Sequence, residues 1–99
     1  MQSLAVSMEF VVYILYSKSY DKIYVGYTSD LIHRFISHNS LAKKGWTIRY
    51  RPWEVIFCEF FQDKKHAAVR EKLMKGALAR KWIREKISSE YKSVGFIFA

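Results

Sequence analysis

The feature that most constrains this chain is an apolar segment near its start. Glu9 to Tyr16 reads EFVVYILY, a near-continuous run of apolar and β-branched residues. Such a run is typical of a strand buried on both faces. Ser17 to Lys22 is polar and suits a hairpin connection. We therefore expect Ile23 to Tyr27 to return as an antiparallel second strand, where Gly26 indicates a bulge or a close backbone approach.

A short helix is expected directly after this hairpin. Thr28-Ser29-Asp30 has the side chains of a helix N-cap, so the helix begins at Ser29 or Asp30 and ends near Asn39. At about 100° per residue, its apolar positions share one face. These positions are Leu31, Ile32, Phe35 and Ile36, with Arg34 and His38 one turn apart at the edge of the face.

The rest of the chain predicts one more strand and two helices. Ser40 to Pro52 is irregular and basic, and Trp53 to Phe61 reads as a third strand. Asp63 is expected to cap a helix that runs to about Lys75, with Ala67, Val69, Leu73 and Met74 as core positions. Gly76 marks a break. The last helix is expected over Leu78 to Ile87, with its inward positions at Leu78, Trp82, Ile83 and Ile87.

The order β-β-α-β-α-α predicts a small α+β domain with helices covering an antiparallel sheet. With 99 residues in all, we expect an N-terminal extension over 1–8, one domain over 9–87 and a tail over 88–99. The tail includes an apolar segment, Val94 to Ala99, that could dock on the body or on a second copy. A homo-oligomer therefore stays open.

Charge indicates the kind of partner. Lysine and arginine number 17 against 9 acidic residues, which gives a formal net charge of +8. A small domain this basic favours a polyanion, most often nucleic acid, although the charge could serve solubility alone. The cationic side chains of the irregular segment are the candidate nucleic-acid contacts: Lys43, Lys44, Arg49 and Arg51. Trp46 and Tyr50 lie between them and could either stack on an unpaired base or anchor the segment to the core.

The cellular setting is inferred from what the sequence lacks. The lone cysteine, Cys58, lies in an apolar run, so we expect a buried structural thiol and a reducing, cytoplasmic location. No apolar run approaches the roughly 18 residues of a membrane helix, so no membrane association is expected. The first seven residues lack the features of a signal peptide, and Met8 could be the true start.

Five side chains stand out as a set, although each has an ordinary interpretation alone. Tyr13 and Tyr24 could be strand aromatics, Arg34 and His38 helix cations, and Glu71 the partner of a lysine four residues later. The second tyrosine follows the first by eleven residues, the arginine follows by ten more, and the histidine by four more. With the tripeptides Val12-Tyr13-Ile14 and Tyr24-Val25-Gly26, this ordered set resembles the GIY-YIG nuclease family over Phe10 to Ile87. The resemblance is closest to the short stand-alone members.

The resemblance implies a three-stranded antiparallel sheet flanked by helices and metal-dependent cleavage of phosphodiester bonds. It assigns Glu71 as the ligand of Mg²⁺ or Mn²⁺, and Arg34 as the contact to the phosphate. Tyr13 would position or deprotonate the attacking water, His38 would accept the proton, and Tyr24 would complete the hydrogen bonding. Two positions depart from the family pattern: Val12 stands in place of a glycine and Val25 in place of an isoleucine, although both remain apolar strand residues. The last helix has no asparagine, a residue that some members carry beside the site.

The resulting hypothesis is a metal-dependent endonuclease acting on DNA, with branched, damaged or single-stranded forms as candidate substrates and repair or recombination as the setting. The alternative is a nucleic-acid-binding module with the nuclease fold and little or no turnover. A structural or assembly protein is a third reading, which leaves the five-residue set unexplained.

Overall fold

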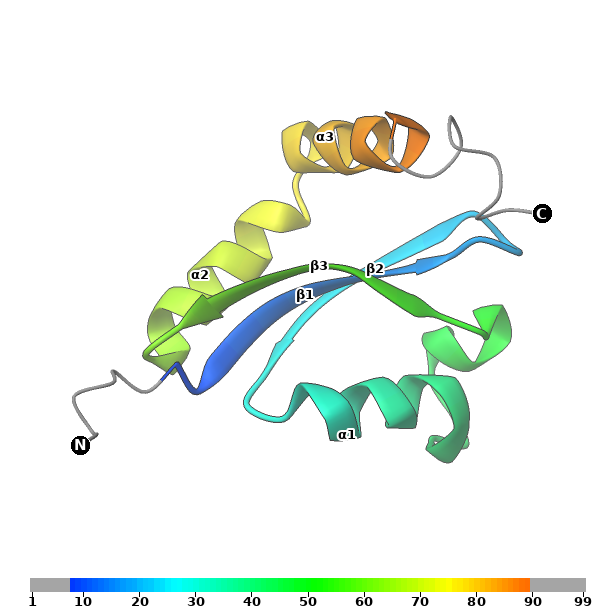
Figure 1. The fold of residues 1–99 in the computed structure, drawn as a ribbon, viewed down its shortest axis with the longest axis horizontal. Helices are drawn as coiled ribbons and strands as arrows, with labels where there is room; N and C mark the ends of the chain where they lie inside the picture. The colour runs from blue at the N-terminus through cyan, green and yellow to red at the C-terminus, as the bar shows by residue number, and fades with distance from the viewer. Residues whose placement is uncertain (1–7, 90–99) are drawn as a thin grey trace.

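The computed structural model describes residues 8–89, which form a three-stranded antiparallel sheet with helices on both faces (Figure 1). The strands are β1 (Phe10–Ser17), β2 (Lys22–Thr28) and β3 (Glu54–Phe61), in the order β2-β1-β3. On one face lie α2 (Lys64–Met74) and α3 (Ala77–Ile87), and on the other α1 (Leu31–Ile36), a π-helical turn η1 (Ser37–Leu41) and a 3₁₀ turn η2 (Trp46–Tyr50). The expected element order and α+β class are confirmed. Residues 1–7 and 90–99, including the predicted docking tail, lie outside the described residues.

The predicted burial of the first strand on both faces is confirmed, because β1 is the central strand. Every residue from Val11 to Ser17 is buried. Alternate side chains point to opposite faces of a sheet. Val12 and Ile14 accordingly pack in the cluster that α2 and α3 cover, whereas Tyr13 and Leu15 pack with Trp53 on the α1 side.

Asp30 is the N-cap of the first helix, as expected: its Oδ1 accepts a hydrogen bond from the backbone N–H of His33 at 3.1 Å. The predicted four-residue inward face is wrong. Leu31 and Phe35 pack against the Tyr13 cluster, but Ile32 is 75% exposed and Ile36 is exposed as well. Neighbouring helix positions differ by about 100°, and the sheet reaches only the side that carries Leu31 and Phe35.

The two C-terminal helices bury a narrower face than their sequences indicate. Asp63 caps α2 through the backbone N–H of His66 at 2.8 Å, as predicted. The buried residues are the expected Ala67, Met74, Ile83 and Ile87. The inward assignment is wrong for the other apolar positions, which are all exposed: Val69, Leu73, Leu78 and Trp82. Each helix rests on the sheet along one stripe, so apolar residues that lie about 100° or more from that stripe stay in solvent.

Two further observations concern the periphery of the domain. Cys58 is exposed, so the expected buried thiol is wrong; β3 is an edge strand, and an apolar run there does not require burial on both sides. At the other end, Arg84 donates from Nη1 to Oδ1 of Asp21 at 2.7 Å, which joins α3 to the β1–β2 hairpin.

Among the described residues, no helix is long and apolar enough to cross a membrane.

Candidate active site

The site is built around a buried pair formed by Tyr13 and His38. The phenol of Tyr13 lies 3.1 Å from Nε2 of His38, and Nδ1 of His38 lies 3.0 Å from Oγ1 of Thr47. Tyr13 comes from the central strand, His38 from the π turn after α1, and Thr47 from η2. All three are buried. The π turn matters because it aims His38 back at the sheet, whereas the sequence placed this residue only at the edge of the helix face.

Gly26 creates the space that Tyr13 occupies. In the antiparallel register Gly26 pairs with Tyr13, so their side-chain positions lie on the same face of the sheet. A Cβ at position 26 would lie 2.5 Å from the Tyr13 hydroxyl oxygen and 2.7 Å from Cζ. Both distances are far below a normal contact. The close approach that the sequence predicted at Gly26 is therefore made by a side chain, and it allows the phenol to cross β2 toward His38.

Tyr24 lies over the same pair. Its ring centroid is 4.7 Å from that of His38 and 6.2 Å from that of Tyr13. Tyr24 lies two residues before Gly26 on β2, so its side chain points to the same α1 face of the sheet. It is half-buried. The three rings therefore form one aromatic cluster in which Tyr24 is nearest to solvent.

The environment shifts the two central groups in opposite directions. Burial, followed by nearby Tyr24, raises the pKa of the Tyr13 phenol; Arg34 lowers it and Glu71 raises it further. Burial, followed by the charges of Arg34 and Arg51, lowers the pKa of His38 from its usual 6.5. At neutral pH the phenol is therefore protonated and the imidazole neutral. The tautomer that suits these contacts has Tyr13 donating to Nε2 while Nδ1 donates to Thr47.

Solvent reaches the cluster through a hollow of about 590 Å³, here called the Arg34 hollow. Arg34 is exposed and extends from the last turn of α1. The side chains that share this hollow with it include Tyr24, His38, Lys44 and Trp46. The exposed His33 also lines it. A cation beside a buried phenol and a neutral imidazole suits an anionic ligand such as a phosphate.

Glu71 approaches from the opposite face of the sheet. It lies on α2, its side chain is 18% exposed, and its Oε2 accepts an ion pair from Lys75 at 2.7 Å. Its charge nevertheless acts on the Tyr13 phenol. This is possible because β2 is an edge strand, so side chains from both layers can approach each other around it. The five residues therefore come from both layers, and Glu71 is not among the residues that line the Arg34 hollow.

Glu71 is also the candidate metal ligand. Within residues 8–89, no group of three or more His, Cys, Asp or Glu side chains could hold a metal ion. A single carboxylate is still compatible with Mg²⁺, which usually keeps several waters and takes one or two protein carboxylates. The second oxygen of Glu71, Oε1, makes no hydrogen bond to any residue from 8 to 89. The donor set thus fits a largely hydrated divalent ion rather than an all-protein cage.

The basic segment between η1 and β3 is fixed by its own side chains. Arg51 donates to three backbone carbonyl oxygens, those of His38 at 2.6 Å, Ala42 at 2.7 Å and Ser37 at 3.1 Å. The amide of Asn39 pairs with the backbone N–H and C=O of Trp53 at 2.6 and 3.0 Å. Arg51 therefore holds the π turn that carries His38, a role different from the phosphate contact expected of it.

The other residues of this segment are directed outward. Lys43, Lys44 and Arg49 are exposed. Trp46 is 46% exposed and packs on Tyr50, with ring centroids 4.7 Å apart, while Tyr50 packs against the Tyr13 cluster. Tyr50 thus anchors the segment, and Trp46 remains partly exposed to solvent.

Sequence reasoning missed two polar residues that position His38. Thr47 holds Nδ1 of the imidazole, and Asn39 clamps the π turn to the start of β3. Asn39 had been interpreted only as the end of a helix. Nothing in the sequence distinguishes Thr47 from any other loop threonine, because its partner is nine residues away and is reached only through the turn geometry.

Comparison with known proteins agrees with this geometry. The family described as the GIY-YIG catalytic domain matches residues 9–86. This chain belongs to the GIY-YIG family. Its relatives include the UPF0213 protein YazA of Bacillus subtilis, 37% identical over 70 residues, or 68% of this chain and 71% of that protein. The UPF0213 protein CPE1444 of Clostridium perfringens is 34% identical over 64 residues, or 65% and 68% of the two chains. No solved structure matches the chain significantly.

Membership confirms the resemblance drawn from the ordered tyrosines, arginine, histidine and glutamate. The GIY-YIG domain is an endonuclease domain, and its members generally use a divalent metal. The two relatives carry names that specify no activity. The activity of this chain therefore has to be inferred from its own site.

Proposed function

We propose that this protein is a metal-dependent endonuclease that hydrolyses phosphodiester bonds in DNA. The observation that carries the proposal is the buried Tyr13–His38 hydrogen bond beneath Arg34 and beside Glu71. A phosphodiester hydrolase needs a base for the attacking water, charge stabilisation for the phosphate, and a place for a Lewis acid. The five residues meet these three needs. Tyr13 and His38 serve the first, Arg34 and Tyr24 the second, and Glu71 the third.

The neutral imidazole of His38 is the terminal proton acceptor in this proposal. Its lowered pKa keeps it unprotonated at neutral pH, and it accepts the Tyr13 hydroxyl proton at Nε2. Tyr13 can then take a proton from the attacking water as it passes its own to His38. A phenol with a raised pKa does not ionise by itself at neutral pH. Tyr13 therefore needs His38 beside it to act as a base toward the water.

Arg34 and Tyr24 are assigned to the phosphate. The Arg34 guanidinium is planar, stays protonated and is exposed in its hollow, so it can contact the non-bridging oxygens and stabilise the charge that grows on them. The Tyr24 hydroxyl completes the hydrogen bonding around the water or the phosphate. Lys43, Lys44 and Arg49 are assigned to backbone phosphates farther along the strand, which fixes position without reading sequence.

Glu71 would hold the divalent ion, Mg²⁺ or Mn²⁺, which when bound polarises the phosphate and stabilises the leaving oxygen. Lys75 now occupies Oε2 of Glu71. Glu71 would therefore hold the ion through Oε1, or through Oε2 once Lys75 has moved away.

The direct test is cleavage of duplex, single-stranded and branched DNA with Mg²⁺, Mn²⁺ or a chelator. Arg34→Ala and Glu71→Gln should each lower the rate by about 10²–10³-fold, the usual cost of one charge-stabilising group. Glu85→Gln on α3 is the matched control, because that glutamate is exposed and remote from the cluster. Unimpaired cleavage by Glu71→Gln, or no cleavage of any nucleic acid by the parent protein, contradicts the proposal.

A second candidate is a nucleic-acid-binding module without turnover. The specific observation in its favour is the Lys75–Glu71 ion pair at the one candidate metal ligand. Salt-sensitive DNA binding with no metal-dependent cleavage would identify this case.

A further inference from the structure

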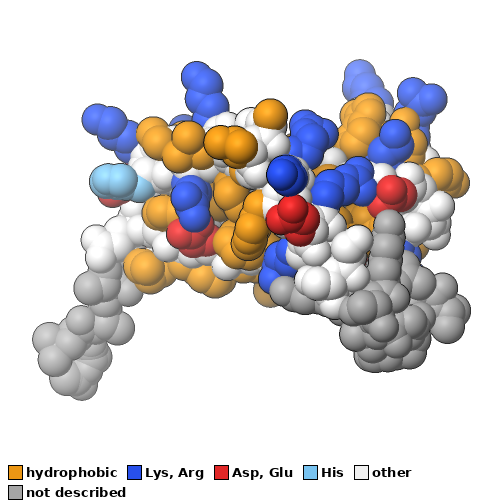
Figure 2. All heavy atoms as spheres, turned by 90° about the horizontal axis from the view of Figure 1, so that it is seen from above, with side chains coloured by type: hydrophobic (Ala, Val, Ile, Leu, Met, Phe, Trp, Pro, Cys, Tyr) orange, Lys and Arg blue, Asp and Glu red, His pale blue; other side chains and the backbone are white. Residues whose placement is uncertain are grey.

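The two C-terminal helices carry the larger share of the net positive charge of this protein. From Asp63 to Ser89 there are nine lysines and arginines and three acidic residues, whereas residues 1–62 contain seven and five. The α2–α3 layer therefore contributes +6 of the net +8. Figure 2 looks onto this layer and shows basic side chains along both helices with fewer acidic ones among them. The basic segment from 43 to 51, which the sequence indicated as the substrate path, is not where most of the excess charge lies.

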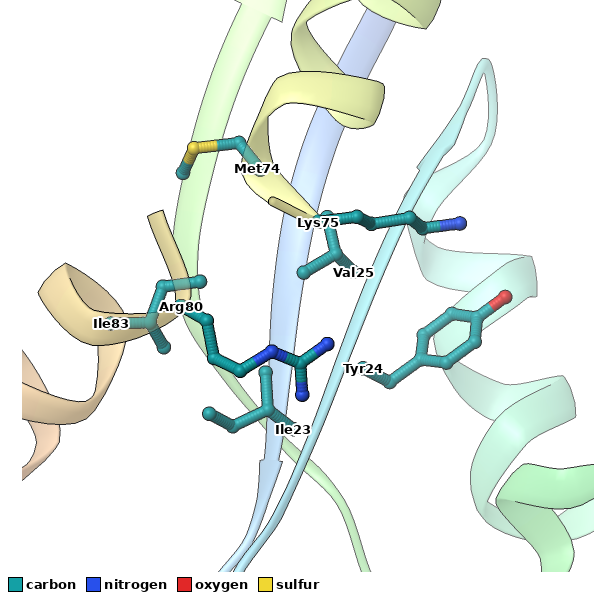
Figure 3. A pocket seen from close by; sticks show the side chains of 7 residues that line it. All are labelled: Ile23, Tyr24, Val25, Met74, Lys75, Arg80 and Ile83. Carbon is teal, nitrogen blue, oxygen red and sulfur yellow. The ribbon is translucent and has the colours of Figure 1, made fainter. Parts of the chain in front are cut away.

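A second hollow opens where this charged layer meets edge strand β2. It has a volume of about 180 Å³ and is here called the Arg80 hollow. Its floor is apolar, and its rim carries the polar groups of Tyr24, Lys75 and Arg80. Figure 3 shows the Arg80 guanidinium extending from α3 toward Tyr24, and Lys75 extending from the end of α2 across β2. Two cations from different helices thus converge on one side of a proposed active-site tyrosine.

Arg80 has no acidic partner among residues 8–89, in contrast to the other two arginines of this layer. Arg70 is paired with Glu59 and Arg84 with Asp21, both at 2.7 Å. The charge of Arg80 is therefore available to a ligand. Lys75 shares its charge with Glu71, so it contributes less in the free protein.

Tyr24 lines both hollows. The Arg34 hollow lies on the α1 side of β2, and the Arg80 hollow lies on the side toward α2 and α3. A chain of phosphates that crosses β2 at Tyr24 would therefore meet Arg34 on one side and Arg80 on the other. A substrate that ended at the scissile phosphate would need no second cation on the far side of β2.

We propose that Arg80, assisted by Lys75, binds a backbone phosphate of the polynucleotide next to the phosphate being cleaved. This inference rests on the proposed function and makes it more specific. The substrate must continue past the scissile bond toward α3, so internal phosphodiester bonds are favoured over terminal phosphates. Both contacts are to phosphate, so they add affinity and register and read no base sequence.

The test measures binding of a labelled single-stranded 20-mer DNA, in EDTA, at several salt concentrations. Each phosphate contact contributes about 0.7 to the slope of log K against log salt for single strands, so Arg80→Ala should reduce that slope by about 0.7 and weaken binding about fivefold at 0.1 M salt. Arg80→Lys should retain most of the slope. Lys81→Ala is the matched control, because it removes one charge from the next position of α3 without touching the hollow. With Mg²⁺, kcat/KM for Arg80→Ala should fall in parallel with affinity.

Equal slopes for Arg80→Ala and Lys81→Ala would overturn the site, as would a parent protein that binds no DNA. The failure of the proposed function has a different signature. Binding that depends on Arg80 without metal-dependent cleavage would leave the phosphate site standing and remove the nuclease. Metal-dependent cleavage that is equally fast in Arg80→Ala and Lys81→Ala would leave the nuclease standing and remove the phosphate site. Thermal unfolding of each variant confirms that it is folded.

Discussion

The substitution Gly26→Ala tests the geometric basis of the site. The new Cβ would lie 2.5 Å from the Tyr13 hydroxyl oxygen, 2.7 Å from Cζ and 3.1 Å from a ring carbon of Tyr24. Normal carbon contacts are about 3.5–4.0 Å, so the Tyr13 ring has to move by about 1 Å. Tyr13 is 1% exposed, so the ring can move only by displacing its neighbours. The move would stretch its 3.1 Å contact with His38 beyond hydrogen-bond range.

The cost follows from these two effects. Overpacking a well-packed site costs about 1–3 kcal/mol, and a lost buried hydrogen bond costs about 1 kcal/mol more. The sum, roughly 2–4 kcal/mol, corresponds to a drop in Tm of roughly 8–30 °C for a domain of this size. Circular dichroism melts measure this drop, and the DNA cleavage assay measures the accompanying loss of activity.

A matched control is available in Gly76→Ala. There the nearest atom to the new Cβ is the backbone oxygen of Leu73 at 3.3 Å, so the loss should stay below about 1 kcal/mol and cleavage should persist. Adding Tyr13→Leu to Gly26→Ala should recover stability without recovering activity, because it removes the ring that clashes. The reasoning is refuted if Gly26→Ala melts within about 2 °C of the parent and still cleaves DNA.

Two further predictions concern His38 and its support. Arg51→Ala should cost roughly 2–4 kcal/mol of unfolding free energy, because three hydrogen bonds to backbone carbonyls are lost. Arg49→Ala is the control and should change Tm by little. Equal Tm values for the two variants would show that the three hydrogen bonds do not hold the π turn. The pKa of His38 is lowered from 6.5 in the folded state, so the unfolded chain binds the proton more readily. Stability that is present above about pH 6.5 should therefore be lost progressively as the pH falls below 6.5. Melts of His38→Gln should show a weaker dependence of Tm on pH below 6.5 than melts of the parent. A parallel profile for His38→Gln would contradict the lowered pKa.

The sequence by itself determined the elements and their class. The run from Glu9 to Tyr16 is too apolar to be anything but an interior strand, and Asp30 and Asp63 set the starts of two helices because their side chains cap nearby backbone N–H groups. It also determined the family, because the order and spacing of the five functional residues are properties of the chain itself. These are local or one-dimensional features, which need no knowledge of the packing.

Tertiary structure alone decided which side chains are buried and how the site is assembled. Val69, Leu73 and Leu78 looked like core residues, but each helix contacts the sheet along only one stripe. The Tyr13–His38–Thr47 chain depends on a π turn and on the empty position at Gly26, both fixed by contacts between residues far apart in sequence. The placement of Arg80 beside Tyr24, and the reach of the Glu71 charge to Tyr13, depend on β2 being an edge strand, since only there can two layers on opposite faces of a sheet share one site.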